Sequence, residues 1–136
     1  MTATPPPLFA SDYLTVTAAA PADSWLVADW HGPQNMASVQ AGGAALLRLL
    51  AASGLHQLFN DNTRVTTMWS DGAEWAGREW FPAMEAAGLR HLAWVYPADV
   101  YASLSIDLTL QFVSGGVVVG TFLTPAEAEA WLRAQA

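Results

Sequence analysis

The polar residues that could carry chemistry are concentrated in one short stretch, Asn60-Asp61-Asn62-Thr63-Arg64, which follows an apolar run. His31 follows a second apolar run, Trp25 to Trp30. A carboxylate and an imidazole held close together could exchange protons with a substrate, and an arginine could hold an anionic ligand. One interpretation is therefore a small acid/base enzyme that uses Asp61 or Glu79 with His31.

Other reactive patterns are missing from the sequence. The chain has no cysteine, and its five basic residues are all arginines, which excludes disulfides, thiolate metal sites, cysteine nucleophiles and Schiff-base lysines. His31, His56 and His91 lack the spacing of metal ligands, and no Gly-x-Ser-x-Gly elbow occurs. We therefore expect no metal, no cofactor and no catalytic residue, and the small acid/base enzyme stays as an alternative.

Composition and charge narrow the class of protein further. With 136 residues, 53% hydrophobic and 12% charged, the chain is expected to fold as a single domain over residues 11–136 after a flexible lead at 1–10. A net charge of −7 argues against nucleic acid and anionic membrane as partners. No leader peptide is visible, and no apolar run approaches the ~20 residues that span a bilayer, so we expect a cytoplasmic protein without stable membrane insertion.

Hydrophobic periodicity predicts alternating strands and helices. The predicted strands cover residues 12–18, 24–30, 57–60, 91–96 and 117–122, with a turn at 19–23. The predicted helices cover residues 36–53, 71–87, 100–112 and 125–134, although the alternation over 106–112 also fits a strand. The order β-β-α-β-α-β-α-β-α predicts an α/β fold whose five-stranded sheet is mostly parallel, with the first strand antiparallel and helices flanking the sheet.

This topology predicts where a ligand would bind. Ligands of open parallel sheets gather beyond the carboxyl ends of the strands. The candidate ligand-binding residues at that edge are His31, Asn60, Asp61, Asn62, Arg64, Trp69 and Tyr96. The alternative is that Asp61 and the asparagines only accept hydrogen bonds from loop amides.

The predicted helix at 71–87 is unusual. On a regular helix Trp75 points about 140° away from Trp80, which belongs to the apolar stripe, so Trp75 is expected to be partly exposed or covered by a partner. Pro82 predicts a break near Phe81. We expect Trp75, flanked by Asp71 and Glu79, to form an interaction surface; the alternative is that Trp75 packs under the loop at 62–69.

Several short motifs occur in a characteristic order. They are Trp25 to Trp30 with Gly32, Asn60-Asp61-Asn62, Trp69-Ser70-Asp71, Trp75, Glu79-Trp80-Phe81-Pro82, Ala87-Gly88-Leu89, Ala93-Trp94-Val95, Thr121-Phe122, Ala128 and Trp131-Leu132. Together they resemble the SpoIIAA-like (STAS/SEC14-like) proteins of bacteria, which belong to the STAS superfamily. The resemblance covers residues 12–133.

The resemblance implies a non-catalytic module that acts through a protein partner or as a homodimer. Its second implication is a carrier of a lipid or small apolar ligand, with Trp69, Trp75 and Trp80 lining a pocket. Antagonists of this family carry a phosphorylatable serine where the third strand gives way to the second helix. Here the stretch reads NDNTRVT, with Asp61 as the strand-end acid and Thr63 as the nearest hydroxyl. We therefore expect no phosphorylation switch.

Overall fold

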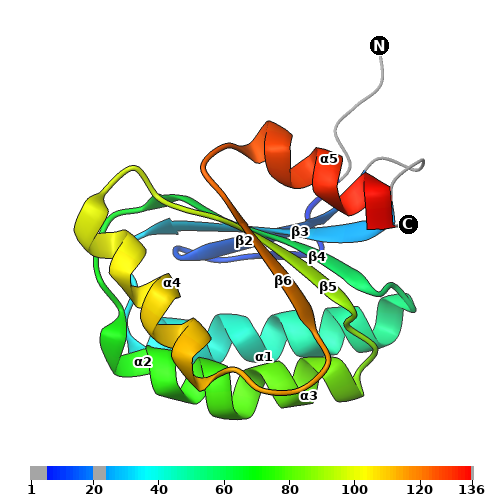
Figure 1. Cartoon of the computed structure of the whole chain (residues 1–136), viewed down its shortest axis with the longest axis horizontal. Helices are drawn as coiled ribbons and strands as arrows, with labels where there is room; N and C mark the ends of the chain where they lie inside the picture. Colours follow the sequence, from blue (N-terminus) through cyan, green and yellow to red (C-terminus); the bar gives the residue numbers. More distant parts are fainter. Residues whose placement is uncertain (1–5, 20–23, 136) are drawn as a thin grey trace.

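Six strands form one mixed sheet in the computed structural model, which describes residues 6–19 and 24–135 (Figure 1). The strands are β1 (Phe9–Ala10), β2 (Leu14–Ala18), β3 (Trp25–Gly32), β4 (Gln57–Val65), β5 (His91–Val95) and β6 (Val118–Phe122). They lie side by side in sequence order; β1, β2 and β3 pair antiparallel, and β3 to β6 pair parallel. The predicted α/β fold with a mostly parallel sheet is confirmed.

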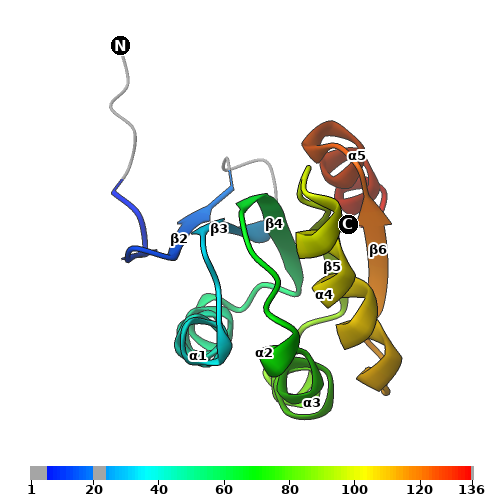
Figure 2. The ribbon, with the colours of Figure 1, turned by 90° about the vertical axis from the view of Figure 1, so that its left-hand side faces the viewer.

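Helices cover both faces of the sheet unequally. They are α1 (Met36–Ser53), α2 (Ser70–Trp75), the π-helix η1 (Ala76–Trp80), α3 (Phe81–Ala86), α4 (Val100–Phe112) and α5 (Pro125–Gln135). Figures 1 and 2 show α1 to α4 on one face and α5 alone on the other. The larger hydrophobic core lies under α1 to α4, and the smaller one under α5.

Local signals explain where two of these helices begin and end. The Asn35 side chain accepts a hydrogen bond from the Ser38 amide at the start of α1, and Gly54 ends that helix with φ at 72°. At α4 the Asp99 carboxylate accepts from the Ala102 amide at 2.9 Å. This cap lets residues 100–112 form a helix, which resolves the ambiguity between helix and strand in favour of the helix.

The structure differs from the sequence prediction at three places. Phe9–Ala10, expected in the flexible lead, pairs with β2 and adds a sixth strand. The polar stretch at 60–64, expected as a loop, lies inside β4, because β3 continues to Gly32 and pairs with it. The break expected near Phe81 is a π-helix that joins α2 to α3. Residues 1–5 of the lead and 20–23 of the predicted turn lie outside the described residues.

Among the described residues, α1 is long and apolar enough to cross a membrane by length and composition alone. The core helix of a soluble protein passes the same test. In this fold Val39, Leu46 and Leu50 of α1 are buried in the larger core, which accounts for its apolar composition.

Candidate functional site

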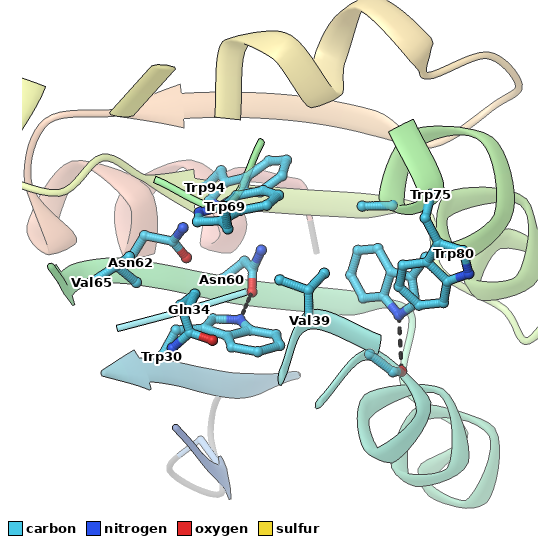
Figure 3. Close-up of a pocket in the computed structure, with 12 residues that line it drawn as sticks. Trp30, Gln34, Val39, Asn60, Asn62, Val65, Trp69, Trp75, Trp80 and Trp94 are labelled. Carbon is cyan, nitrogen blue, oxygen red and sulfur yellow. Dashed lines mark hydrogen bonds between the residues drawn. The ribbon is translucent and has the colours of Figure 1, made fainter. Parts of the chain in front are cut away.

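A pocket opens between the sheet and the helices α1 and α2, with an empty volume of about 410 Å³ including its mouth (Figure 3). It is lined mainly by aromatic and small apolar residues and by three amides. The lining residues are Trp30, Gln34, Val39, Gly43, Asn60, Asn62, Val65, Trp69, Trp75, Ala76, Trp80 and Trp94. Five of them are tryptophans, and none of the described lining residues carries a charge.

Glycines in α1 allow the tryptophans to pack close to this helix. A Cβ atom at Gly42 would lie 2.4 Å from the ring of Trp30, and one at Gly43 would lie 2.9 Å from the ring of Trp80. The indole nitrogen of Trp80 donates a hydrogen bond to the Gly43 carbonyl at 2.9 Å. The Gly42-Gly43 pair therefore sets how near these two rings approach α1.

The π-helix η1 explains the position of Trp75. In a π-helix, hydrogen bonds span five residues, so residues five apart lie close to one face. Trp75 and Trp80 consequently both face Gly43, where a Cβ atom would lie 3.1 Å from the tip of the Trp75 ring. The 140° separation expected for a regular helix is wrong for this reason, and Trp75 is half-buried against the larger core.

Strand alternation places the two asparagines of β4 on the pocket side of the sheet, and a β-bulge follows. Asn60 lies opposite Ala28 in the parallel pairing, and the register then shifts, so that Asn62 and Thr63 together face the single residue Trp30. Bulges re-aim the side chains beside them, and here Arg64 is exposed whereas Val65 lines the pocket. Asn60 and Asn62 both line the pocket, whereas the intervening Asp61 does not.

Most polar groups around the pocket have partners within the protein. The Trp30 indole nitrogen donates to the Asn60 side-chain oxygen at 2.8 Å. The Gln34 amide nitrogen donates to the Tyr13 and His31 carbonyls at 3.1 and 3.2 Å, and its oxygen accepts from the Ser38 hydroxyl at 2.8 Å. These hydrogen bonds therefore hold the side chains of Trp30, Asn60 and Gln34 in place around the pocket.

Two polar atoms of the pocket have no partner among residues 6–19 and 24–135. They are Oδ1 of Asn62, an acceptor, and Nε1 of Trp94, a donor. Both residues are only 3% exposed. A buried polar atom without a hydrogen bond costs about 1–3 kcal/mol. The pocket therefore holds one acceptor and one donor that a bound molecule could satisfy.

Trp69 closes the pocket above Trp94. Their rings stack with centroids 6.1 Å apart and planes 23° from parallel (Figure 3). The Trp69 amide donates to the Ser105 hydroxyl at 2.8 Å, which fixes the start of α2 to α4. A planar surface is thus held rigidly beside the two unpartnered atoms.

The pocket brings together three of the seven predicted ligand-binding residues, Asn60, Asn62 and Trp69. The other four lie outside it. Arg64 forms a hydrogen-bonded ion pair with Asp29, and Asp61 accepts from the Thr63 amide at 2.9 Å. A ring nitrogen of His31 lies 3.2 Å from the Thr15 hydroxyl.

Tyr96, the fourth of these, donates a hydrogen bond from its hydroxyl to Asp107 at 2.6 Å. Burial, and after it this hydrogen bond, raises the pKa of Tyr96 above its usual value. For Arg64, the hydrogen bond that its guanidinium donates to Asp29 raises the pKa of a group that is already always charged. These polar side chains are therefore occupied by neighbours in the fold.

Two of the predicted interface residues are exposed on the surface. They are Asp71, which also accepts a hydrogen bond from the Met36 amide at the start of α1, and Glu79. The third, Trp75, lines the pocket together with Trp69 and Trp80, so these three tryptophans meet as the ligand-carrier interpretation supposed.

The sequence analysis missed Trp30, Gln34 and Trp94. A signal was present: Asn60 and Asn62 share the face of buried Leu58, and polar residues on a buried strand face need partners nearby. Trp30 and Trp94 lie on the two strands that flank β4.

The hydroxyls differ in their positions from the sequence expectation. Thr63 is half-buried inside β4, away from any helix start. Ser70, however, is exposed and is the first residue of α2, so a serine does start this helix, after a link at 66–69. The absence of a phosphorylation switch stays a prediction.

The six-stranded mixed sheet with helices on both faces defines an α/β fold. Among solved structures, the chain is similar to the anti-sigma factor antagonist SpoIIAA in its unphosphorylated form. The two share a TM-score of 0.58 and 15% identity over 88% of this chain and 97% of that one. The predicted SpoIIAA-like fold is confirmed, and an identity this low supports the fold alone. No family model and no curated protein matches the sequence.

Proposed function

We propose that the chain is a non-catalytic binding module whose site is the tryptophan pocket. The observation that carries this proposal is the pair of buried, unpartnered polar atoms on Asn62 and Trp94 in a pocket walled by tryptophans. Binding pockets of proteins are mostly apolar with a few placed polar groups, and this pocket has that composition. The ligand-carrier interpretation of the sequence is therefore the one that the geometry favours.

Filling the pocket should weaken ligand binding. Val39→Phe adds a ring to the wall formed by α1, and we expect it to weaken the binding of small neutral probes at least tenfold. Naphthalene, quinoline and decan-1-ol are suitable probes, with binding followed by ligand-observed NMR and by tryptophan fluorescence. A bound probe also raises the free energy of unfolding, by about 2.7 kcal/mol at a concentration one hundred times its Kd.

The matched control is Val27→Phe, which makes the same change on the other face of the sheet, in the core under α5. It should leave probe binding unchanged. If no probe binds the native protein, or if both variants bind as the native protein does, the pocket is not a binding site.

A protein partner is the second candidate function. The fold is that of SpoIIAA, an anti-sigma factor antagonist, which supports a regulatory role through protein binding. Val100 and Tyr101 at the start of α4 are 73% and 69% exposed, and Met68 and Leu104 are also exposed. Exposed aromatic and aliphatic side chains of this kind can anchor a partner or a second copy. The surface of Trp75, Asp71 and Glu79 remains our other proposed contact.

Self-association tests the case in which the partner is a second copy. If Tyr101 anchors a homodimer, Tyr101→Ser should shift sedimentation velocity profiles from dimer to monomer without changing the circular dichroism spectrum. Glu74→Ser on the exposed face of α2 serves as the control. A native protein that sediments as a monomer at every concentration would contradict homodimer formation.

A further inference from the structure

The unpartnered polar atoms of the tryptophan pocket limit which ligands can form hydrogen bonds there. This inference rests on the ligand-binding function proposed above. Trp94 can only donate through its indole nitrogen, so the complementary atom of a ligand must be an acceptor. The unpartnered oxygen of Asn62 accepts, so it calls for a donor. A purely apolar molecule would leave both atoms without a hydrogen bond.

The charge of the ligand follows from the lining. No charged side chain is among the described lining residues, and the ion pair of Arg64 on β4 with Asp29 on β3 lies outside the pocket. Transferring an ion from water to such surroundings without a counter-charge is strongly unfavourable. The bound molecule is therefore neutral.

The shape of the ligand follows from the walls. Figure 3 shows Trp69 and Trp94 one over the other, with Asn60 and Asn62 to one side and Trp75 and Trp80 toward the other end. Rigid indole faces pack best against flat rings, which stack in offset or edge-to-face arrangements. A flexible chain would lose its conformational freedom and gain no such stacking.

We propose that the pocket binds a small, neutral, planar nitrogen heterocycle with a hydrogen-bond acceptor and a donor on one edge. The acceptor meets the indole nitrogen of Trp94, and the donor meets the side-chain oxygen of Asn62. Rings with a lactam or an amino-azine edge have this chemistry, and asparagine amides pair with such edges in other complexes.

A series of probes of one shape tests this proposal on the native protein. Quinolin-2-one carries both a carbonyl acceptor and an N–H donor, 1-methylquinolin-2-one keeps the acceptor only, and naphthalene has neither. We expect Kd values that rise in this order, with quinolin-2-one bound at least about tenfold more tightly than naphthalene, since each unmet buried polar atom weakens binding. Decan-1-ol represents a flexible apolar ligand.

Substitutions at Asn62 and Trp94 test which residue contacts the donor and which contacts the acceptor of the ligand. Asn62→Leu should make 1-methylquinolin-2-one bind as tightly as quinolin-2-one, because the donor no longer has a partner. Trp94→Phe should reduce the advantage of both quinolinones over naphthalene. Trp25→Phe, the same substitution in the core under α5, should leave all Kd values unchanged.

The outcomes separate this inference from the function on which it rests. Equal affinity for quinolin-2-one and naphthalene, or tight binding of decan-1-ol alone, would overturn the heterocycle and leave a binding pocket for apolar ligands. An affinity ratio between quinolin-2-one and naphthalene that is the same in the native protein, the Asn62 variant and the Trp94 variant would also overturn it. Failure of all four probes to bind would contradict the pocket function itself.

Discussion

Gly42→Ala is expected to lower the free energy of unfolding by roughly 2–4 kcal/mol. The added methyl group would lie 2.4 and 2.6 Å from two carbon atoms of the Trp30 ring and 3.0 Å from a methyl group of Leu14. Neither neighbour can yield easily, because both are buried in the larger core. Either the helix moves away from the sheet or the ring of Trp30 turns out of its place.

A turned Trp30 ring has a second consequence for the pocket. Its indole nitrogen would leave the side-chain oxygen of Asn60, which is buried and would then have no partner. The loss of that hydrogen bond adds to the strain of overpacking. Together these two costs exceed the ~1 kcal/mol by which alanine stabilises a helix relative to glycine. We therefore expect Gly42→Ala to weaken probe binding as well as stability.

Chemical denaturation, with probe binding measured on the same samples, checks this expectation. Gly72→Ala is the matched control, since the nearest atoms to its added methyl group belong to Val39 at 3.3 Å. At position 72 the higher helix propensity of alanine nearly offsets the cost of the tight contact with Val39, so the free energy of unfolding should change little. An equal loss of stability in the two variants would contradict the assignment of Gly42 to a close approach.

The fold could be predicted from the sequence because its signals are local. Asn35 and Asp99 begin helices, Gly54 ends one, and apolar runs such as Trp25 to Trp30 form strands. The helical stripe through Val39, Leu46 and Leu50 likewise appears in the larger core.

The site was predicted only in part, because two irregularities redirect its side chains. The π-helix turns Trp75 toward Gly43, and the bulge in β4 separates Asn62 from Arg64. Regular periods of 3.6 and 2 residues describe neither feature. Hydrophobic patterns also gave no reason to group Trp94 with Asn62, since their meeting depends on the pairing of β4 with β5.

Asn60 and Asn62 lie on the same strand and line the same pocket, yet their amides have different roles. Asn60 holds Trp30 in place through a hydrogen bond of 2.8 Å, whereas the oxygen of Asn62 has no protein partner among the described residues. One amide therefore stabilises the fold, and the other is kept at a cost in stability. Residues that break a local rule in this way tend to belong to functional sites.

Leucine substitutions at these two positions should change stability in opposite directions. Asn62→Leu removes a buried unpartnered amide and adds apolar surface, so it should raise the free energy of unfolding of the ligand-free protein by about 1 kcal/mol. Asn60→Leu removes the acceptor of the buried Trp30 indole nitrogen, so it should lower the free energy of unfolding by about 1–3 kcal/mol.

Urea denaturation of the two variants beside the native protein measures both effects, and the slopes should agree because the surface exposed on unfolding is nearly the same. Both variants replace asparagine by leucine on the same strand, so β-propensity and side-chain volume change equally in the two and each serves as the control for the other. If Asn62→Leu destabilises the protein as much as Asn60→Leu does, the Asn62 amide has a structural partner and is not reserved for a ligand. Opposite signs, together with equal affinities for quinolin-2-one and 1-methylquinolin-2-one in Asn62→Leu but not in Asn60→Leu, would show that the chain maintains this asparagine for binding at the expense of stability.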